Sequence, residues 1–596
     1  MRAMSSALRA VRTTFAPASA NRRAVASPMP RLAPVISAVF PVRSFIRASI
    51  NPSVSFSAKR LVTARPARTT LDQAAPCRDI GCNSIHSKGH IMLSRAPLAT
   101  SSLLALSLAA GPVAADVTAE QVWSDWKDYL ETFGYEMTAM EDMSSDTLTV
   151  SDLSLAMDME EADIGMTIGT MTLTNRSDGS VEIGVPESLP ITFDVTSDMG
   201  EDVSGTINYD NTGLSIIVSG DPEDMTYQYT ADTLGMRVSE LVVDGEPMPF
   251  GAMEMMLKGM TGSAQMKLGE MRNMMQDFSA EELAYNVDVE VPDEESTFKM
   301  SGAVNGLSFD GTGSYPMGEY DAEEIGAMLK AGFAFSGSFS HEGGETSVAA
   351  TERDESFNTQ SSSESGSLTV SIDKDHLAYG GTVKGLKSTA TGADIPFPIE
   401  INAEESGFEL RMPISKAEEP QDYKLSILLE NFTTSEMLWG MIDPQGKLAR
   451  DPATIELAVS GQATPGFDLL DPEQMEAVES GEAMPGEIQS ANIDALKLSV
   501  AGAELTGDGA FTFDNADMTT FPGMPKPSGA VDLKLTGGNT LLDKLVEMGL
   551  LPEEQASGAR MMMGLFAVPV EGEDTLNSKI EINDEGHVLA NGQRLR

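Results

Sequence analysis

Few side chains of this 596-residue sequence have the types and spacing that catalysis needs. A hydrolytic nucleophile needs a neighbouring base, and after residue 115 the chain has no cysteine and three histidines, His341, His376 and His587. The sequence has no Gly-x-Ser-x-Gly, Walker or dinucleotide-binding motif. Carboxylates are so numerous that no pair stands out as the acid and base of a glycosidase. We therefore expect a protein that is not an enzyme and assign no catalytic residue.

Two groups of residues have the chemistry of metal ligands. One resembles zinc-ligand spacing but lies in a stretch without hydrophobic periodicity; its members are Cys77, Cys82, His86 and His90. The other consists of turn carboxylates that could surround Ca²⁺, although the calcium-loop consensus is absent; its members are Asp508, Asp514 and Asp517. We expect neither a metal nor another cofactor.

Methionine is abundant, with 37 residues that include runs such as Met561-Met562-Met563. Three interpretations are open: core filling in place of leucine, a pliable apolar groove, or thioether ligands for copper(I). Methionine is spread over the whole chain, which favours core filling, followed by the groove and then by copper.

A secretory signal decides which residues matter for the mature protein. The stretch Met92–Ala115 has Arg95, an apolar run over residues 98–110, a Gly-Pro break and small residues before Asp116. The apolar run is shorter than the ~20 residues of a membrane-spanning helix. We predict cleavage after Ala115, export to the periplasm and no transmembrane span in the mature chain.

Residues 1–91 are rich in arginine, alanine, proline and serine, and contain 14 basic but only two acidic residues. An organellar transit sequence has this composition, but a complete secretory signal directly behind it favours a start codon placed too far upstream, with translation beginning at Met92. We expect residues 1–91 to be an unstructured leader.

The chain from Asp116 onward is strongly acidic, with 88 acidic and 25 basic residues. Such a surface repels nucleic acid and anionic headgroups. From Thr147 onward, apolar and polar residues alternate with a period of two, and Asp-Gly and Asn-containing turns separate the runs. The pattern predicts a mainly β protein with large curved antiparallel sheets and a few short helices.

Helical spacing predicts five helical segments within this β pattern. They are Val117–Phe133, capped by Thr118; a Met-rich segment, Phe250–Phe278; Thr434–Ile442; Pro472–Ser480; and a pair over Thr540–Phe566. In that pair, Asn539 is the predicted cap, Gly549 the end of the first helix and Pro552 the start of the second.

A Ser- and Glu-rich stretch, residues 354–367, is predicted to be an exposed loop between a first β-rich half, 116–353, and a second, 368–596. The Met-rich helices are expected to cover or gate an apolar face of the sheet. The residues that we expect to line this groove are Met253, Met256, Met260, Met271, Met275, Phe278, Met562 and Phe566.

Three stretches resemble one known family: TAEQVWSDW from Thr118, EMLWGMIDPQGKLARDPAT over 436–454, and the whole ending from Gly537. They are similar to the alphaproteobacterial DUF2125 family, an exported domain of unknown function, over nearly the whole mature chain. The family implies no catalytic or binding residues. The β-rich pattern closed by a helix pair and a strand ending in Ala590-Asn591-Gly592-Gln593 also resembles the architecture of AsmA-type envelope proteins, whose curved sheets are implicated in lipid handling.

These observations predict an exported, periplasmic, non-enzymatic protein that binds a lipid, another apolar ligand or an envelope protein along its sheet. A purely structural or interaction module with a filled core is the alternative, and a carboxylate-based hydrolase is a weaker one. Nucleic acid is not an expected partner.

Overall fold

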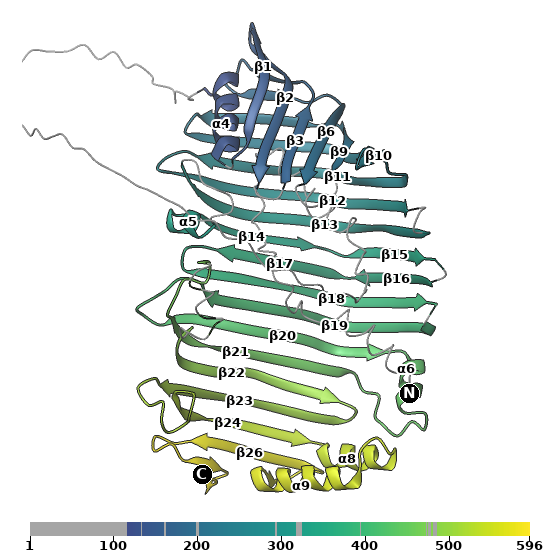
Figure 1. Ribbon diagram of the computed structural model, residues 1–596, viewed down its shortest axis with the longest axis vertical. Coiled ribbons are helices and arrows are strands. Elements are labelled where there is room, and N and C mark those ends of the chain that lie inside the picture. Colours follow the sequence, from purple (N-terminus) through teal and green to yellow (C-terminus); the bar gives the residue numbers. More distant parts are fainter. Residues whose placement is uncertain are drawn as a thin grey trace, which may run out of the picture. The chain divides into compact units, whose positions relative to one another are not determined.

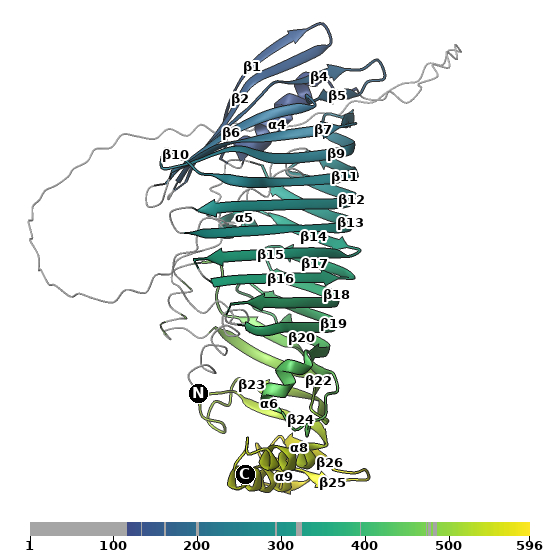
Figure 2. The same cartoon turned by 90° about the vertical axis from the view of Figure 1, so that its right-hand side faces the viewer.

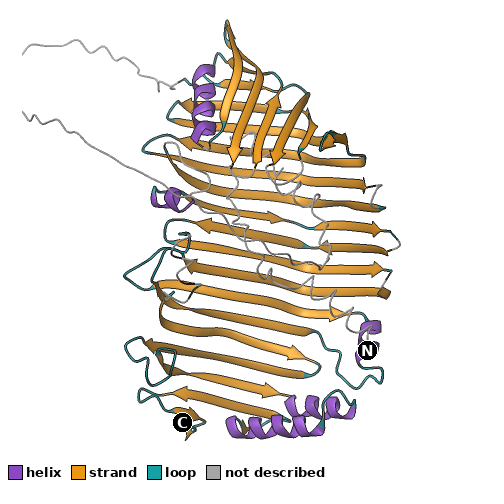
Figure 3. Ribbon diagram, in the orientation of Figure 1, coloured by secondary structure: helices purple, strands orange, loops and turns teal. Residues whose placement is uncertain are grey.

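The protein is described by a computed structural model (Figure 1). It covers residues 116–596 except 133, 160–161, 198–201, 292–294, 318–324, 354, 394, 472–473, 475–477, 479 and 481–484. The predicted leader and signal peptide, and most of the predicted helix Pro472–Ser480, lie outside the described residues. In the described part, 28 strands form one hydrogen-bonded antiparallel sheet, which confirms the predicted fold class (Figure 3).

The strands follow one another along the chain, most of them with short connections. In chain order they are β1 (Glu136–Ser144), β2 (Thr147–Met159), β3 (Ala162–Ile168), β4 (Met171–Asn175), β5 (Val181–Gly184), β6 (Ser188–Ser197), β7 (Val203–Thr212), β8 (Ser215–Asp221), β9 (Asp224–Val243), β10 (Glu246–Pro247), β11 (Phe250–Lys267), β12 (Met271–Val291), β13 (Ser296–Pro316), β14 (Ala334–His341), β15 (Gly344–Glu352), β16 (Glu355–Ser363), β17 (Ser365–Ile372), β18 (His376–Gly392), β19 (Ile395–Pro413), β20 (Gln421–Thr434), β21 (Ala453–Pro465), β22 (Gly486–Val500), β23 (Ala503–Asp514), β24 (Lys526–Thr536), β25 (Val568–Pro569), β26 (Thr575–Ile582), β27 (Val588–Ala590) and β28 (Gln593–Arg594).

Strands β2 and β9 join two branches of the sheet at its N-terminal end. One branch runs β2–β3–β6–β7–β9, and the other runs β2–β4–β5–β8–β9. Different halves of β2 and β9 pair with each branch, so the two branches enclose an interior between them. This part of the chain can therefore bury side chains on two facing layers.

From β9 onward the sheet is a succession of neighbouring antiparallel strands (Figures 1 and 2). Strands β11, β12 and β13 are long; β14 and β15 then share the length of β13, and β17 and β16 share that of β18. The strands β18 to β24 continue one by one, and β26, β27 and β28 end the sheet. Neighbouring strands in space are thus mostly neighbours in sequence.

Helix α4 (Ala119–Thr132) confirms the predicted N-terminal helix. Thr118 and Gln121 cap it reciprocally: the backbone N–H of Gln121 donates to Thr118 Oγ1 and that of Thr118 donates to Gln121 Oε1. Its apolar face, which includes Trp123 and Trp126, packs in a core with residues of β2, β4, β5, β8 and β9. The indole N–H of Trp126 donates to the buried Tyr227 hydroxyl at 3.2 Å. Helix and sheet therefore close the N-terminal interior together.

A buried ion pair ties α4 to the long strands. Asp125 Oδ1 lies 2.8 Å from the guanidinium of Arg272 in β12, and the two side chains are 5% and 3% exposed. The same guanidinium lies over the ring of Tyr129, 5.1 Å from its centroid. Burial raises the pKa of Asp125, and the positive charge of Arg272 opposes that rise. Each of the two charges depends on the other, because neither reaches solvent.

The substitution Asp125→Asn should lower the free energy of unfolding by roughly 3–5 kcal/mol, because it leaves the Arg272 charge buried and unpaired. The double substitution Asp125→Leu with Arg272→Met should recover most of that loss. Urea denaturation followed by tryptophan fluorescence measures both. For comparison, Arg237→Met breaks a pair with Asp210 whose side chains are 57% and 43% exposed and should cost less than ~1 kcal/mol; equal losses at the two sites would contradict the prediction.

The predicted Met-rich helix at Phe250–Phe278 is wrong: these residues form β11 and most of β12. Its buried residues Met253, Leu257, Met260 and Ala264 do recur at intervals of four, three and four, which is the period of a helix. A strand acquires this spacing because Gly259 takes a left-handed conformation, with φ of +60°, and the alternation changes phase there. Methionine also favours helices in isolation.

The predicted loop at 354–367 is also wrong. Residues 355–363 form β16 and residues 365–372 form β17, and both strands pair on both sides. Serine gives no apolar alternation, but here serines pair across strands, as where the hydroxyls of Ser361 and Ser388 lie 2.9 Å apart. The hydrogen-bonded sheet therefore runs through the expected boundary.

The remaining helices are α5 (Ile325–Lys330), α6 (Glu436–Ile442), α8 (Gly538–Glu547) and α9 (Glu553–Phe566). The last three confirm the predicted short helix and the C-terminal pair. Pro552 precedes α9 as expected, and Gly549, with φ of +71°, follows α8.

The cap of α8 differs from the expected one, because it comes from Asp574 rather than from Asn539. The carboxylate of Asp574 accepts hydrogen bonds from the backbone N–H of Asn539 at 3.3 Å and from that of Thr540 at 2.7 Å. Partial burial alone would raise the pKa of Asp574, but these hydrogen bonds hold it below its ordinary value.

The substitution Asp574→Ala should destabilise α8 by about 1 kcal/mol, because two N-terminal N–H groups lose their acceptor. A lowered carboxyl pKa means that this stabilisation is present above pH 4 and is lost as the pH falls and Asp574 is protonated. Hydrogen exchange of the α8 amides should therefore speed up in the variant at pH 7, and much less at pH 3. Glu571→Ala, an exposed change in the same connection, is the control and should leave α8 exchange unchanged.

Candidate ligand-binding face

A continuous row of apolar side chains crosses the sheet on one of its faces. Residues directly opposite each other in an antiparallel ladder share a face, and the strand registers connect one residue each of β8, β9, β11, β12, β13, β14, β17 and the strands β18 to β24. In this order the row is Ile216, Tyr229, Gly262, Phe278, Phe309, Phe339, Leu368, Gly381, Phe408, Ile427, Leu457, Leu496, Gly507 and Leu533. Glycine is the only interruption of its apolar character.

Two flanking rows, displaced by two residues along each strand and by three at the bulge in β22, have the same character. One contains Val370, Tyr379, Leu410, Leu425, Val459, Ile493, Val531 and Ile580. The other contains Leu429, Ile455, Leu498, Leu505, Leu535 and Leu576. We call the three rows together the apolar face.

The apolar face begins in the core and ends in solvent. Ile216 and Tyr229 are 1% and 3% exposed and belong to the core around α4, and Phe278 and Phe339 pack against it. Farther along, Phe408 is 40% and Ile427 is 47% exposed. Other exposed members lie between these values: Tyr379, Leu425, Ile455 and Leu498. Among the described residues, the buried clusters include no residue from β16 to β28, so the apolar face there has no covering layer.

The opposite face of the same strands is polar. Between the apolar positions lie Ser338, Glu409, Ser426 and Lys497, which the registers place on the other side of the sheet. Lys424 and Glu409 form an ion pair across strands at 2.7 Å. The sheet therefore separates a charged surface from an apolar one, as the alternation in the sequence predicts.

Glycines let aromatic rings lie flat on the apolar face. A Cβ atom at Gly337 would be 2.6 Å from the ring of Phe335 and 3.0 Å from that of Phe309. The rings occupy the space that a side chain at Gly337 would need. Tyr379 and Phe408 contact each other on neighbouring strands, with ring centroids 5.0 Å apart. The result is a continuous aromatic and aliphatic surface.

The residues predicted to line a groove do not lie together. Met253 and Met260 are buried at 8% and 4% exposure, whereas Met256 and Met275 are exposed on the opposite face. Met271 is half-buried beside Gly332, after α5. Phe278 belongs to the apolar face, and Met562 and Phe566 lie on α9. A ligand-binding role for these residues stays a prediction, but the six that lie on β11 and β12 cannot gate the sheet as helices, because these strands are part of it.

The exposed residues of the apolar face, such as Phe408 and Ile427, were not among the predicted site residues. The alternation of β18 to β24 was visible in the sequence. What was missing was the register, which shows that the apolar positions of ten strands fall in line.

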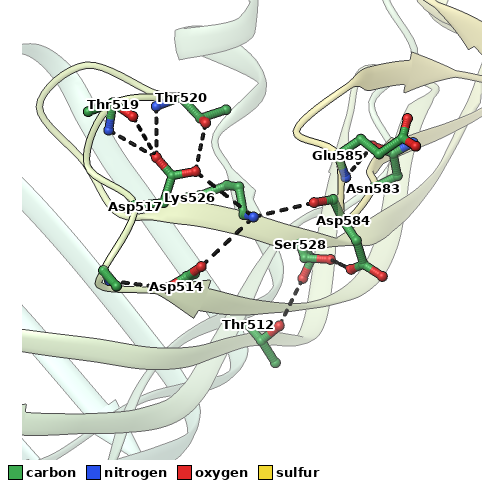
Figure 4. A network of polar contacts seen from close by, with 11 residues as sticks. Thr512, Asp514, Asp517, Thr519, Thr520, Lys526, Ser528, Asn583, Asp584 and Glu585 are labelled. Carbon is green, nitrogen blue, oxygen red and sulfur yellow. Dashed lines mark hydrogen bonds and ion pairs between the residues drawn. The ribbon is translucent and has the colours of Figure 1, made fainter.

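The turn carboxylates considered for Ca²⁺ contact a lysine (Figure 4). The ammonium group of Lys526 lies 3.8 Å from Asp514 and 3.9 Å from Asp517. Asp517 also accepts hydrogen bonds from the hydroxyl and backbone N–H groups of Thr520 and Thr519, which lower the pKa of its carboxyl. Asp508 pairs with Asp532 in mid-strand. Within the described ranges, no group of three or more metal-ligating side chains has the geometry to hold an ion.

The three histidines also lie apart from one another. His341 Nδ1 accepts the backbone N–H of Gly343 at 3.2 Å in the β14–β15 turn. His376 lies 4.0 Å from Asp373 and His587 lies 3.1 Å from Glu585, each within its own turn. Each histidine therefore contacts its own turn and not another histidine.

Residues 330–593, which include the exposed part of the apolar face, match the family model described as "Uncharacterized protein conserved in bacteria (DUF2125)". Over these residues the chain is similar to the DUF2125 family. The match runs from the end of α5 to β28 and so contains α6, α8, α9 and the strands β14 to β28. The matched region thus contains the part of the sheet, from β16 onward, that lacks a covering layer.

A comparison with curated proteins gives no match. Among solved structures, the unliganded ferric citrate transporter FecA aligns over 77% of this chain and 76% of that chain, at 10% identity and a TM-score of 0.14. A score this low carries no argument about fold or function. The resemblance to AsmA-type envelope proteins stays a prediction. No helix among the described residues is long and apolar enough to cross a membrane.

The substitution Gly337→Val should lower the free energy of unfolding by about 1–3 kcal/mol, because the new side chain displaces the rings of Phe335 and Phe309. Ser338→Val is the matched control, since Ser338 is exposed on the polar face of the same strand and valine favours strands. Urea denaturation of both variants tests this difference. Equal stability of the two would show that the rings do not depend on the glycine.

Proposed function

We propose that this protein is exported to the periplasm and binds the acyl chain of a lipid along its apolar face. The observation that carries the proposal is the uncovered apolar face from β18 to β24. Monomeric soluble proteins rarely expose contiguous apolar patches larger than a few hundred Å², and larger patches mark binding sites. A filled core explains the N-terminal part around α4, but not the aligned Phe408, Ile427 and Leu457.

The dimensions of the apolar face fit an extended chain. The central row crosses ten strands from Phe309 to Leu533, and neighbouring strands are ~4.8 Å apart, so the row is roughly 43 Å long. The hydrocarbon core of a bilayer, which contains two opposed layers of acyl chains, is ~30 Å thick. The row therefore has room for one or more lipid chains.

Chemistry also favours a lipid over other ligands. Few charged or strongly polar side chains interrupt the three rows, so a ligand bound there would gain affinity from buried apolar area, at ~25 cal/mol per Å². The acidic surface elsewhere repels nucleic acid. Export rests on the predicted signal peptide Met92–Ala115. The alternative occupant is an apolar segment of an envelope protein.

Native mass spectrometry of the mature protein after gentle extraction should detect co-purifying lipid, and a fatty acid with a fluorophore should bind the purified chain. The substitution Ile427→Asp should weaken binding of this probe by about tenfold or more, because a carboxylate in the row must be desolvated by the bound chain. Ile427 and Ser426, the site of the control substitution described next, are both partly exposed. Both variants should therefore keep the fold.

Ser426→Asp is the matched control, since it places the same charge one residue away on the polar face. It should leave probe binding unchanged. The proposal fails if no lipid co-purifies and the probe does not bind, or if the two variants behave alike. Denaturation midpoints of both variants separate a loss of binding from a loss of folding.

A further inference from the structure

The helices beside the C-terminal end of the apolar face expose an unusual number of large apolar side chains. Seven such side chains on α6, α9 and the α8–α9 connection are between 50% and 77% exposed. They are Met437, Met441, Ile442, Leu550, Met561, Met562 and Leu565. Met561 and Leu565, as well as Met437 and Met441, are four residues apart and so lie on one side of their helix.

These helices are held together as one edge of the protein. Lys447, which follows α6, contacts α8 through an ion pair with Glu547 at 3.3 Å. On α9, Ala556 is fully buried, and the last carbonyl, that of Phe566, accepts hydrogen bonds from Ser578 and Asn591. On α9, the exposed residues are therefore on the side that faces away from the buried Ala556. We call α6, α8, α9 and these connections the helical edge.

The charges of the helical edge argue for a neutral partner. The two segments 436–451 and 538–566 contain seven acidic and four basic residues. Three of the basic side chains are already in ion pairs: Lys447 with Glu547, Arg450 with Glu436, and Arg560 with Asp543. A surface that binds anionic lipid needs unpaired lysine or arginine. The helical edge instead offers methionine and leucine among side chains whose net charge is negative.

The helical edge also adjoins the open end of the apolar face. Helix α8 begins two residues after β24, and a Cβ atom at Gly538 would lie 2.6 Å from Leu535 of the apolar face. The other end of the same rows is closed by the core around α4. A chain that enters the apolar face from a bilayer would therefore enter beside these helices.

We propose that the helical edge is a docking surface for the interface of a zwitterionic lipid bilayer, with the exposed methionine and leucine side chains inserted among the headgroups. The inference rests on the proposed function in one respect: docking would bring the open end of the apolar face to a source of lipid. Docking itself requires only the exposed apolar side chains.

Flotation of the full mature chain with phosphatidylcholine vesicles tests the proposal. The wild type should float with the vesicles, and adding phosphatidylglycerol should reduce binding. The double substitution Met561→Gln with Leu565→Gln should reduce the bound fraction at least tenfold; glutamine favours helices, so α9 should persist. Glu554→Gln, an exposed change on the same helix, should not reduce it.

Trp439 on α6 supplies a second readout, because it is half-buried whereas Trp123 and Trp126 are each 2% exposed within the core. Brominated phosphatidylcholine should quench Trp439 in the wild type and in Ile427→Asp, but not in the α9 double variant. Vesicle binding that survives the α9 substitutions, a wild type that does not float, or binding that increases with phosphatidylglycerol would overturn the proposal.

The two proposals fail separately. Ile427→Asp should still float with vesicles while losing the fatty-acid probe, and the α9 double variant should still bind the probe in solution. If the probe never binds but the helical edge still docks, the proposed function is wrong and the docking surface stands. If a protein rather than vesicles binds the edge, docking to lipid is wrong and the apolar face is unaffected.

Discussion

Backbone hydrogen bonds to both neighbours hold each strand from β11 to β24 in its register, and all other features of the sheet depend on this. A shift of one strand by a single residue would move its whole set of side chains to the opposite face. Phe408 and Ile427 lie in one row because β19 and β20 keep their register, and the same holds for each pair of strands as far as β24. Register therefore decides whether the apolar residues form a surface or a scatter of exposed side chains.

The long strands also share an irregularity, at which the alternation between the two faces of the sheet shifts by one residue. Gly259, Gly306, Gly385 and Asn431 all take left-handed conformations in the interior of long strands, with φ between +50° and +60°. Acidic side chains from adjacent strands lie against them: a Cβ atom at Gly259 would be 2.6 Å from Glu281, and Asn431 donates to Glu404 at 2.6 Å. Because β11 and β12 both change phase at this line, their ladder keeps its register across it. The irregular residues thus change which side chains face the core, and the ladder between β11 and β12 resumes in the same register beyond them.

Stability is distributed unevenly along the sheet. The N-terminal part has α4, its tryptophans and the Asp125–Arg272 pair, all buried between two layers. The part from β16 onward has hydrogen bonds and cross-strand side-chain pairs, and much of its apolar area stays in contact with solvent. Exposed apolar area is a liability unless a partner covers it. A ligand or partner bound to the uncovered face would remove this apolar area from solvent. The closed core at one end supplies the rigidity that a single layer of sheet lacks.

The sequence alone determined the β class, the N-terminal helix, the short helix with Trp439 and the C-terminal helix pair, because these depend on local periodicity, turns and breakers. It also determined the acidic surface and the absence of cysteine after residue 115. Tertiary structure decided that Phe250–Phe278 is sheet, since the phase change at Gly259 imitates a helical period. It decided that the serine-rich stretch 354–367 forms paired strands. Neighbouring strands on both sides supply the hydrogen bonds, and a run of serines shows no apolar alternation that would predict a strand. Above all it decided the apolar face, since alternation places a residue on one side of its own strand, but only the register between strands aligns those sides into a surface.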